Sequence, residues 1–203
     1  MTAQPYYYGI DGFPDHSWGC CYRSGQMLLG ALGLPVPPLR TLMRHAGTWP
    51  AYRAGRRGRP LWIEPPDVAR SVRRLDPALR VREWLYRPAA TDDQEVRRRL
   101  LRCTPAHYGR QRTLGRAALE PLLRAQLRRA PVVVDNGISA YLLVALEGGT
   151  VRLLDPHVTS AAAAPAAWPA ERFWGQPLWM MASADPVERP TLVTLRQAVP
   201  AQK

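Results

Sequence analysis

The chain has 203 residues, enough for one domain with a substantial core, and no apolar run approaches the ~20 residues that a membrane-spanning helix needs. Three cysteines, two of them adjacent, without a C-x-x-C pair or a secretory signal, predict a reducing, cytoplasmic setting with no disulfide, metal or cofactor. The formal net charge of +12 is almost all arginine, but the arginines are spread along the chain and form no recognisable nucleic-acid module, so no specific nucleic-acid partner is expected.

The N-terminal part of the chain leads into a predicted helix. Residues 6–14 are expected to form an extended arm with turns, and an apolar run with helical spacing predicts a buried helix over 20–32. Gly19 allows the chain to enter this helix sharply. Asp15 and Ser17 are both candidate N-cap residues.

Cys20 stands at the start of this predicted helix. In the first turn it lies at the positive end of the helix dipole, which favours the thiolate, and the thiolate is the nucleophilic form of cysteine. The alternative is a structural role, since free cysteine is among the most buried residue types. This stretch alone leaves both interpretations open.

Further helices and strands follow along the chain. Helices are expected over 39–46, 66–74, 91–103 and 113–129, and Pro121 is expected to kink or break the last of them. Strands are expected over 79–86, 131–135, 140–147, 150–154 and 178–183, with a hairpin turn at Gly148-Gly149. Loops are expected over 48–60 and 161–170. We expect one domain over 1–187 and a disordered tail over 188–203, which has few apolar residues to bury.

Asp155 and His157 follow the strand predicted over 150–154. Residues two apart in an extended segment point the same way, and Pro156 favours an extended conformation for Asp155. The carboxylate can therefore hold the imidazole and stabilise its protonated form. Alternatively, the proline simply makes a turn and His157 lies at the surface. A cysteine at a helix start, followed far along the chain by a histidine with a carboxylate beside it, is typical of cysteine proteases.

Two segments resemble the ubiquitin-fold-modifier-specific proteases. Residues 6–26, YYYGIDGFPDHSWGCCYRSGQ, are similar to that family's active-site segment, in which Tyr-Gly-x-Asp-Gly leads into Gly-Trp-Gly-Cys-x-Tyr-Arg-Ser. Residues 131–160, PVVVDNGISAYLLVALEGGTVRLLDPHVTS, are similar to its second segment, in which two strands lead into Asp-Pro-His-Tyr-Thr-Gly. The autophagin proteases share Trp-Gly-Cys and Asp-Pro-His but lack the tyrosine run and the Tyr-Arg-Ser, so they fit less well.

The resemblance implies roles for four residues. Cys20 matches the family's nucleophile, His157 the general base, Asp155 the acid that orients the base, and Tyr8 the tyrosine whose hydroxyl helps to form the oxyanion hole. The departures from the family pattern are Ser17 for a glycine before the tryptophan, Val158 for the tyrosine after the histidine, Ser160 for the glycine that ends this motif, Asp135-Asn136 for a glycine-rich turn, and Glu64-Pro65 for a Gly-Ser-like pair. These departures bear on substrate preference and efficiency more than on the chemistry.

The resemblance also implies a fold and an activity. The expected fold is α+β and papain-like, with the central helix that carries the nucleophile packed on an antiparallel sheet. The expected activity is that of a cysteine protease that cleaves after the C-terminal glycine of a ubiquitin-like modifier, in maturation or deconjugation. The implied partners are the ubiquitin-fold modifier and its conjugates, and a monomer is expected. Two alternatives stay open: a weak or inactive module that binds a ubiquitin-like protein, and a cysteine protease with a divergent target.

Several other residues have simpler interpretations. His16 is expected at the surface or in a capping role, because its position near Cys20 gives poor geometry for a base. Trp18 is expected to wall the cleft between the helix and the sheet. Core or edge positions are expected for the aromatic residues Trp168, Phe173, Trp174 and Trp179.

Overall fold

The computed structural model describes residues 6–89, 91, 92, 94, 98, 99, 113–158 and 164–186. The helical elements are α1 (Cys20–Ala31), α2 (Leu39–Ala46), α3 (Trp49–Arg53), the 3₁₀ turn η1 (Arg59–Leu61), α4 (Pro65–Leu75), α7 (Arg116–Leu127) and α8 (Ala170–Trp174). The strands are β1 (Leu79–Tyr86), β2 (Thr113–Leu114), β3 (Val132–Asp135), β4 (Ala140–Glu147), β5 (Thr150–Leu154), β6 (Ala166–Pro169) and β7 (Trp179–Pro186). Most of the helix expected over 91–103, and the whole tail over 188–203, lie outside the described residues. Within those residues, no helix is both long and apolar enough to cross a membrane.

The strands form one seven-stranded sheet in the order β2-β1-β7-β3-β4-β5-β6. Neighbouring strands pair antiparallel, except that the short β2 runs parallel to β1, with Thr113 opposite Leu85. The expected hairpin joins β4 to β5 through Gly148 and Gly149, both of which have a positive φ. The expected α+β class is confirmed.

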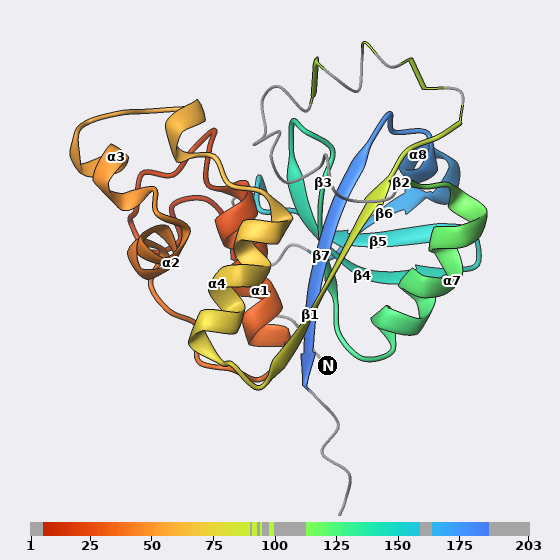
Figure 1. Cartoon of the computed structure of the whole chain (residues 1–203), viewed down its shortest axis with the longest axis horizontal. Coiled ribbons are helices and arrows are strands. Elements are labelled where there is room, and N and C mark those ends of the chain that lie inside the picture. Colours follow the sequence, from red (N-terminus) through yellow and green to blue (C-terminus); the bar gives the residue numbers. More distant parts are fainter. Residues whose placement is uncertain are drawn as a thin grey trace, which may run out of the picture.

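Helices cover both faces of this sheet (Figure 1). α1, α2 and α4 lie on one face, where Met27 and Val133 belong to the same core. α7 and α8 lie on the other, where Leu123 packs in a core with Val132 and Val134. Alternate residues of a strand point to opposite faces, so consecutive valines of β3 supply both cores. Because each fully buried aliphatic side chain contributes about 1.5–3 kcal/mol, the first of these cores holds α1 firmly against the sheet.

The segment that follows α2 is more regular than the sequence predicts. A loop is expected over 48–60, but the structure has α3 and η1 there. Pro50 lies in the first turn of α3, where its missing N–H breaks no helical hydrogen bond. Trp49 and Tyr52 stack with ring centroids 5.4 Å apart and pack against the core, which holds this short helix in place.

Three expectations for the C-terminal half are wrong in detail. The helix expected over 113–129 begins only at Arg116, because residues 113–114 pair with β1, and it continues through Pro121 because buried Leu119 and Leu123 hold it on the sheet. The loop expected over 161–170 contains β6, which pairs with β5 and so satisfies the backbone hydrogen-bonding groups at the outer edge of that strand. The last strand extends to Pro186, beyond its expected end, because its whole length pairs with β1.

Candidate active site

Cys20 is the first residue of α1 and is partly exposed. No acidic residue lies in the first turn of α1, so no carboxylate there offsets the partial positive charge at this end of the helix dipole. The expectation that Asp15 or Ser17 caps the helix is wrong: the N-cap is Gly19, and no side chain caps α1. Burial raises the pKa of the neighbouring Cys21 thiol, which lies in the core and stays protonated.

Asp15 instead forms a buried ion pair with Arg23 of α1. Its Oδ2 accepts the Arg23 Nε–H at 2.6 Å, and its Oδ1 accepts the Gly9 N–H at 2.8 Å. Both side chains of the pair are fully buried, and Arg23 also donates to Asp11 at 2.7 Å. A Cβ at Gly19 would lie 2.4 Å from Asp15 Oδ2, so only glycine fits there. This network fixes the N-terminal arm to the helix. The sequence alone does not predict it, because nothing local marks these charges as buried.

The arm also meets the strand end that carries the Asp-His pair. The Tyr8 N–H donates to the Pro156 carbonyl at 3.0 Å. The Tyr8 ring stands edge-on to the His157 ring, with centroids 5.1 Å apart and planes at 86°. One main-chain hydrogen bond therefore joins the nucleophile side of the site to the histidine side.

Asp155 and His157 lie side by side after β5, as their spacing predicts. Asp155 Oδ1 is 2.6 Å from His157 Nδ1 and also accepts the His157 backbone N–H at 2.9 Å. Burial disfavours the charged form of each side chain. For Asp155, the hydrogen bonds with His157 outweigh the effect of burial and hold its pKa below its usual range. Burial likewise lowers the pKa of His157, yet its hydrogen bonds with Asp155 and Cys20 raise that pKa to about 9.

The side chain of Cys20 meets both His157 and Tyr8. Since His157 Nδ1 faces Asp155, Nε2 is the ring nitrogen left for the hydrogen bond with Cys20. The Tyr8 hydroxyl lies close enough to Cys20 to interact with both its side chain and its backbone N–H. Burial and the neighbouring Cys20 raise the pKa of Tyr8, so its hydroxyl stays protonated. The structure thus brings together all four residues that the resemblance singles out.

The remaining candidates lie around this cluster or away from it. Trp18 is 4% exposed and packs edge-on to Tyr22 at 5.8 Å, so it belongs to the core and does not wall a cleft. His16 is exposed, as expected, and its ring is tilted against that of Tyr8 at 5.5 Å. The core beneath α8 contains the predicted aromatic residues Phe173, Trp174 and Trp179, with Trp168 packed against it.

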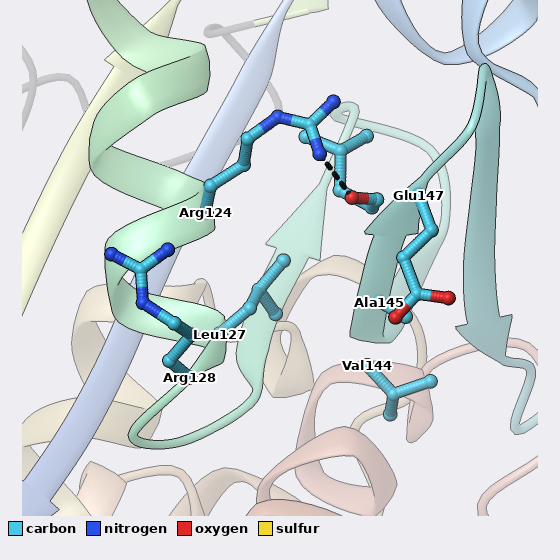
Figure 2. Close-up of a pocket in the computed structure, with 7 residues that line it drawn as sticks. Arg124, Leu127, Arg128, Val144, Ala145 and Glu147 are labelled. Carbon is cyan, nitrogen blue, oxygen red and sulfur yellow. Dashed lines mark hydrogen bonds between the residues drawn. The ribbon is translucent and has the colours of Figure 1, made fainter.

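Two cavities lie beside α7 and include none of these residues. One of about 250 Å³ lies between α7 and β4, where Arg124 donates to the Leu146 carbonyl and Arg128 and Glu147 also line it (Figure 2). The other, of about 420 Å³, is lined by residues of β1 and α7. Neither lining has a cysteine, serine, threonine or histidine, so neither holds a thiol, hydroxyl or imidazole nucleophile. In the described part of the chain, no three His, Cys, Asp or Glu side chains are grouped so as to hold a metal ion.

Comparison with known proteins is informative at the level of structure. The sequence matches no protein-family model and no curated protein. The structure is similar to the crystal structure of UfSP from C. elegans, with a TM-score of 0.55 and 21% sequence identity. The match covers 91% of this chain and 34% of that one, so the chain spans about a third of the length of the protein it resembles. This likeness confirms the papain-like cysteine-protease fold and, at the level of fold, the resemblance to the ubiquitin-fold-modifier-specific proteases.

Proposed function

We propose that this chain is a thiol-dependent peptidase or isopeptidase that cleaves after the C-terminal glycine of a ubiquitin-like modifier of the ubiquitin-fold-modifier type. The observation that carries the proposal is the cluster of Cys20, His157, Asp155 and Tyr8, drawn from opposite ends of the chain. The papain-like fold supports the reaction class. The two sequence segments that resemble the family support the class of substrate.

In the proposed mechanism, Cys20 is the nucleophile and His157 is its base. His157 Nε2 takes the thiol proton, or already holds it in a resident ion pair, which suits a histidine whose pKa is raised to about 9. The thiolate attacks the carbonyl carbon of the terminal glycine, while Asp155 orients the imidazolium. His157 then protonates the leaving amine as its C–N bond breaks. Water attacks the resulting thioester, which releases the modifier and restores the thiol.

Two donors are positioned for the oxyanion that develops in this attack. They are the Tyr8 hydroxyl and the backbone N–H of Cys20, and both lie beside the Cys20 thiol. Because burial keeps Tyr8 protonated, its hydroxyl can donate throughout the working pH range. A donor of this kind stabilises a transition state by about 3 kcal/mol.

A modifier probe that carries an electrophile at its C-terminal glycine tests the proposed chemistry. We expect the ubiquitin-fold-modifier probe to form a covalent adduct that peptide mass spectrometry maps to Cys20. Cys20→Ala should form no adduct while keeping its far-UV circular dichroism spectrum, and Cys21→Ala, the matched variant of the adjacent buried cysteine, should still react. Appreciable cleavage of a modifier precursor by Cys20→Ala would refute the assignment.

A panel of modifier precursors separates the proposed target from the alternatives. Cleavage of the ubiquitin-fold-modifier precursor in preference to the others supports the proposal. Cleavage of a different substrate makes the chain a cysteine protease with a divergent target. Binding of a modifier with neither cleavage nor an adduct at Cys20 makes it a binding module.

A further inference from the structure

The segment that contains α2 and α3 carries arginines but no carboxylates. Between Asp15 and Glu64, the sequence has no aspartate and no glutamate. Arg23, within this segment, is buried in its ion pair with Asp15. Five other arginines of the segment are exposed, and we call them the arginine patch: Arg40, Arg44, Arg53, Arg56 and Arg57. They lie on or just after α2 and α3, on the side of the molecule opposite α7 (Figure 1).

Two arginines of the patch are stacked on aromatic rings that also stack on each other. Arg44 Cζ lies 5.4 Å from the centroid of the Trp49 ring, and Arg57 Cζ lies 5.2 Å from that of Tyr52. The centroids of the Trp49 and Tyr52 rings are 5.4 Å apart, with their planes at 20°. Phe13 stacks on Tyr52 in turn, at 5.1 Å. These contacts hold both guanidinium groups in place and leave the N–H donors at their edges for an anion.

No carboxylate neutralises the arginine patch within the residues that the structure describes. None of its members forms an ion pair there. The next acidic residues along the chain are engaged elsewhere, since Glu64 and Asp67 form the capping box of α4 and Asp67 also pairs with Arg70. Arg40 and Arg44 even stand one turn apart on α2, where like charges repel each other. The patch therefore gathers positive charges without a counter-charge of its own.

The surface around the patch distinguishes between classes of anionic partner. Among the described residues, the exposed large apolar side chains all lie outside residues 16–63. Attachment to a lipid surface needs an apolar face that enters the membrane, and a protein interface has an apolar centre. Trp49 and Tyr52 provide neither, because they are partly buried and pack against the core. Interfaces with nucleic acids are instead polar and strongly positive, and arginine donates two hydrogen bonds to a phosphate group.

We propose that the arginine patch binds the phosphate backbone of a nucleic acid without regard to base sequence. The stacked guanidinium groups of Arg44 and Arg57 are already ordered, so they lose little conformational entropy on binding a phosphate. Release of counterions from the nucleic acid drives the association, which therefore weakens as the salt concentration rises. No base-reading module is needed, because contacts to phosphate carry no sequence information. This activity is separate from the proposed peptidase function.

Fluorescence anisotropy with a labelled single-stranded RNA of about 20 nucleotides and mixed sequence tests the proposal on the full chain. We expect the wild type to bind at about 50 mM salt. The double variant Arg44→Gln/Arg57→Gln should bind about 10-fold more weakly at that salt concentration. Its slope of log K against log salt concentration should be shallower by about 1.4, because each phosphate contact contributes about 0.7.

The matched control removes the same charge from the opposite side of the molecule. Arg128 follows α7 and Arg152 lies in β5, and both are exposed. Arg128→Gln/Arg152→Gln should weaken RNA binding less than about 2-fold, because exposed charges more than a Debye length from the bound strand are screened. Cys20→Ala should bind the RNA as the wild type does, so a failure of the proposed peptidase function leaves this test intact.

Equal weakening in the two double variants would overturn the proposal, because binding would then follow the net charge of the whole chain. The absence of binding by the wild type at about 50 mM salt would overturn it as well. Tighter binding to a glutamate-rich peptide would assign the patch to an acidic protein instead, and tighter binding to phosphatidylserine vesicles would assign it to a membrane. If Arg44→Gln/Arg57→Gln loses its native circular dichroism spectrum, Arg53→Gln/Arg56→Gln carries the same expectation, since both side chains are exposed.

Discussion

The two sides of the candidate site are held in place by different kinds of interaction. On the nucleophile side, Asp15 and Arg23 form an ion pair at 2.6 Å with no solvent exposure, and this pair joins an arm to a helix. On the histidine side, Asp155 and His157 form a pair within a single turn, with 25% and 34% of their side chains exposed.

Because of this difference, the stability of the site and its chemistry depend on different residues. Removing one partner of a fully buried ion pair leaves an uncompensated charge and costs about 3–5 kcal/mol. Water screens a partly exposed pair, which therefore contributes much less to stability. We expect changes on the nucleophile side to alter the free energy of unfolding, and changes on the histidine side to alter protonation while the fold survives.

The largest expected effect comes from Asp15→Ala. It leaves the buried Arg23 charge with only the partly exposed Asp11 as its ion-pair partner and removes the acceptor of the Gly9 N–H, so the free energy of unfolding should fall towards the lower end of about 3–5 kcal/mol in urea denaturation. Glu171→Ala is the control, because it breaks the exposed pair with Arg116 and should cost less than about 1 kcal/mol. Equal losses in the two variants would contradict the contrast between buried and exposed pairs.

Tyr8→Phe should affect the chemistry strongly and the fold little. It keeps the ring contact with His157 but removes the hydroxyl that contacts Cys20. We expect kcat for cleavage of a modifier precursor to fall about 10²- to 10³-fold, or about 3 kcal/mol in activation free energy, as for the loss of one oxyanion donor. Tyr7→Phe removes a neighbouring hydroxyl outside the site and should leave kcat unchanged. A comparable fall in Tyr7→Phe would assign the effect to the arm as a whole.

The local features of the site could be predicted from the sequence. The α1 helix begins at Cys20 as the apolar spacing predicts, and the two-residue offset of Asp155 and His157 places them side by side. The link between the N-terminal arm and α1 could not be predicted, because Asp15 looks like an ordinary N-cap residue until Arg23 is known to lie beneath it.

The parts of the fold that could not be predicted also depend on contacts with residues distant in the sequence. The two strands at the edges of the sheet, β2 and β6, are short and carry no strand pattern of their own, since β6 is made of alanine, tryptophan and proline. Their structure comes from pairing with β1 and β5, which lie outside each segment. Long-range pairing of this kind leaves no trace in local composition.

Asp155→Asn tests the histidine side through the pH dependence of stability. The His157 pKa of about 9 in the folded protein exceeds the ~6.5 of an unfolded chain, so the folded state binds the proton more tightly. The resulting stability is fully present below pH ~6.5 and is lost as the pH rises through about 9. With 34% of the side chain exposed, we expect a loss of about 1 kcal/mol between pH ~6 and pH ~9.5 in the wild type, and less in Asp155→Asn. Equal losses in urea denaturation would mean that Asp155 does not hold the proton on His157.

The smallest expected effect comes from Ser17→Gly, back on the nucleophile side. Ser17 has a φ of 70° and is the one non-glycine residue with a positive φ in the described part of the chain. This conformation costs an L-residue about 1–2 kcal/mol, which glycine avoids at the expense of a larger unfolded-state entropy, so the net gain in unfolding free energy should be about 0.5 kcal/mol. Ser17→Ala removes the hydroxyl but keeps the strain and should give no gain. A stabilised Ser17→Gly whose His157 pKa matches the wild type would show that the turn into α1 carries stability without influencing the base, whereas a loss of stability would mean that the serine hydroxyl supports the turn.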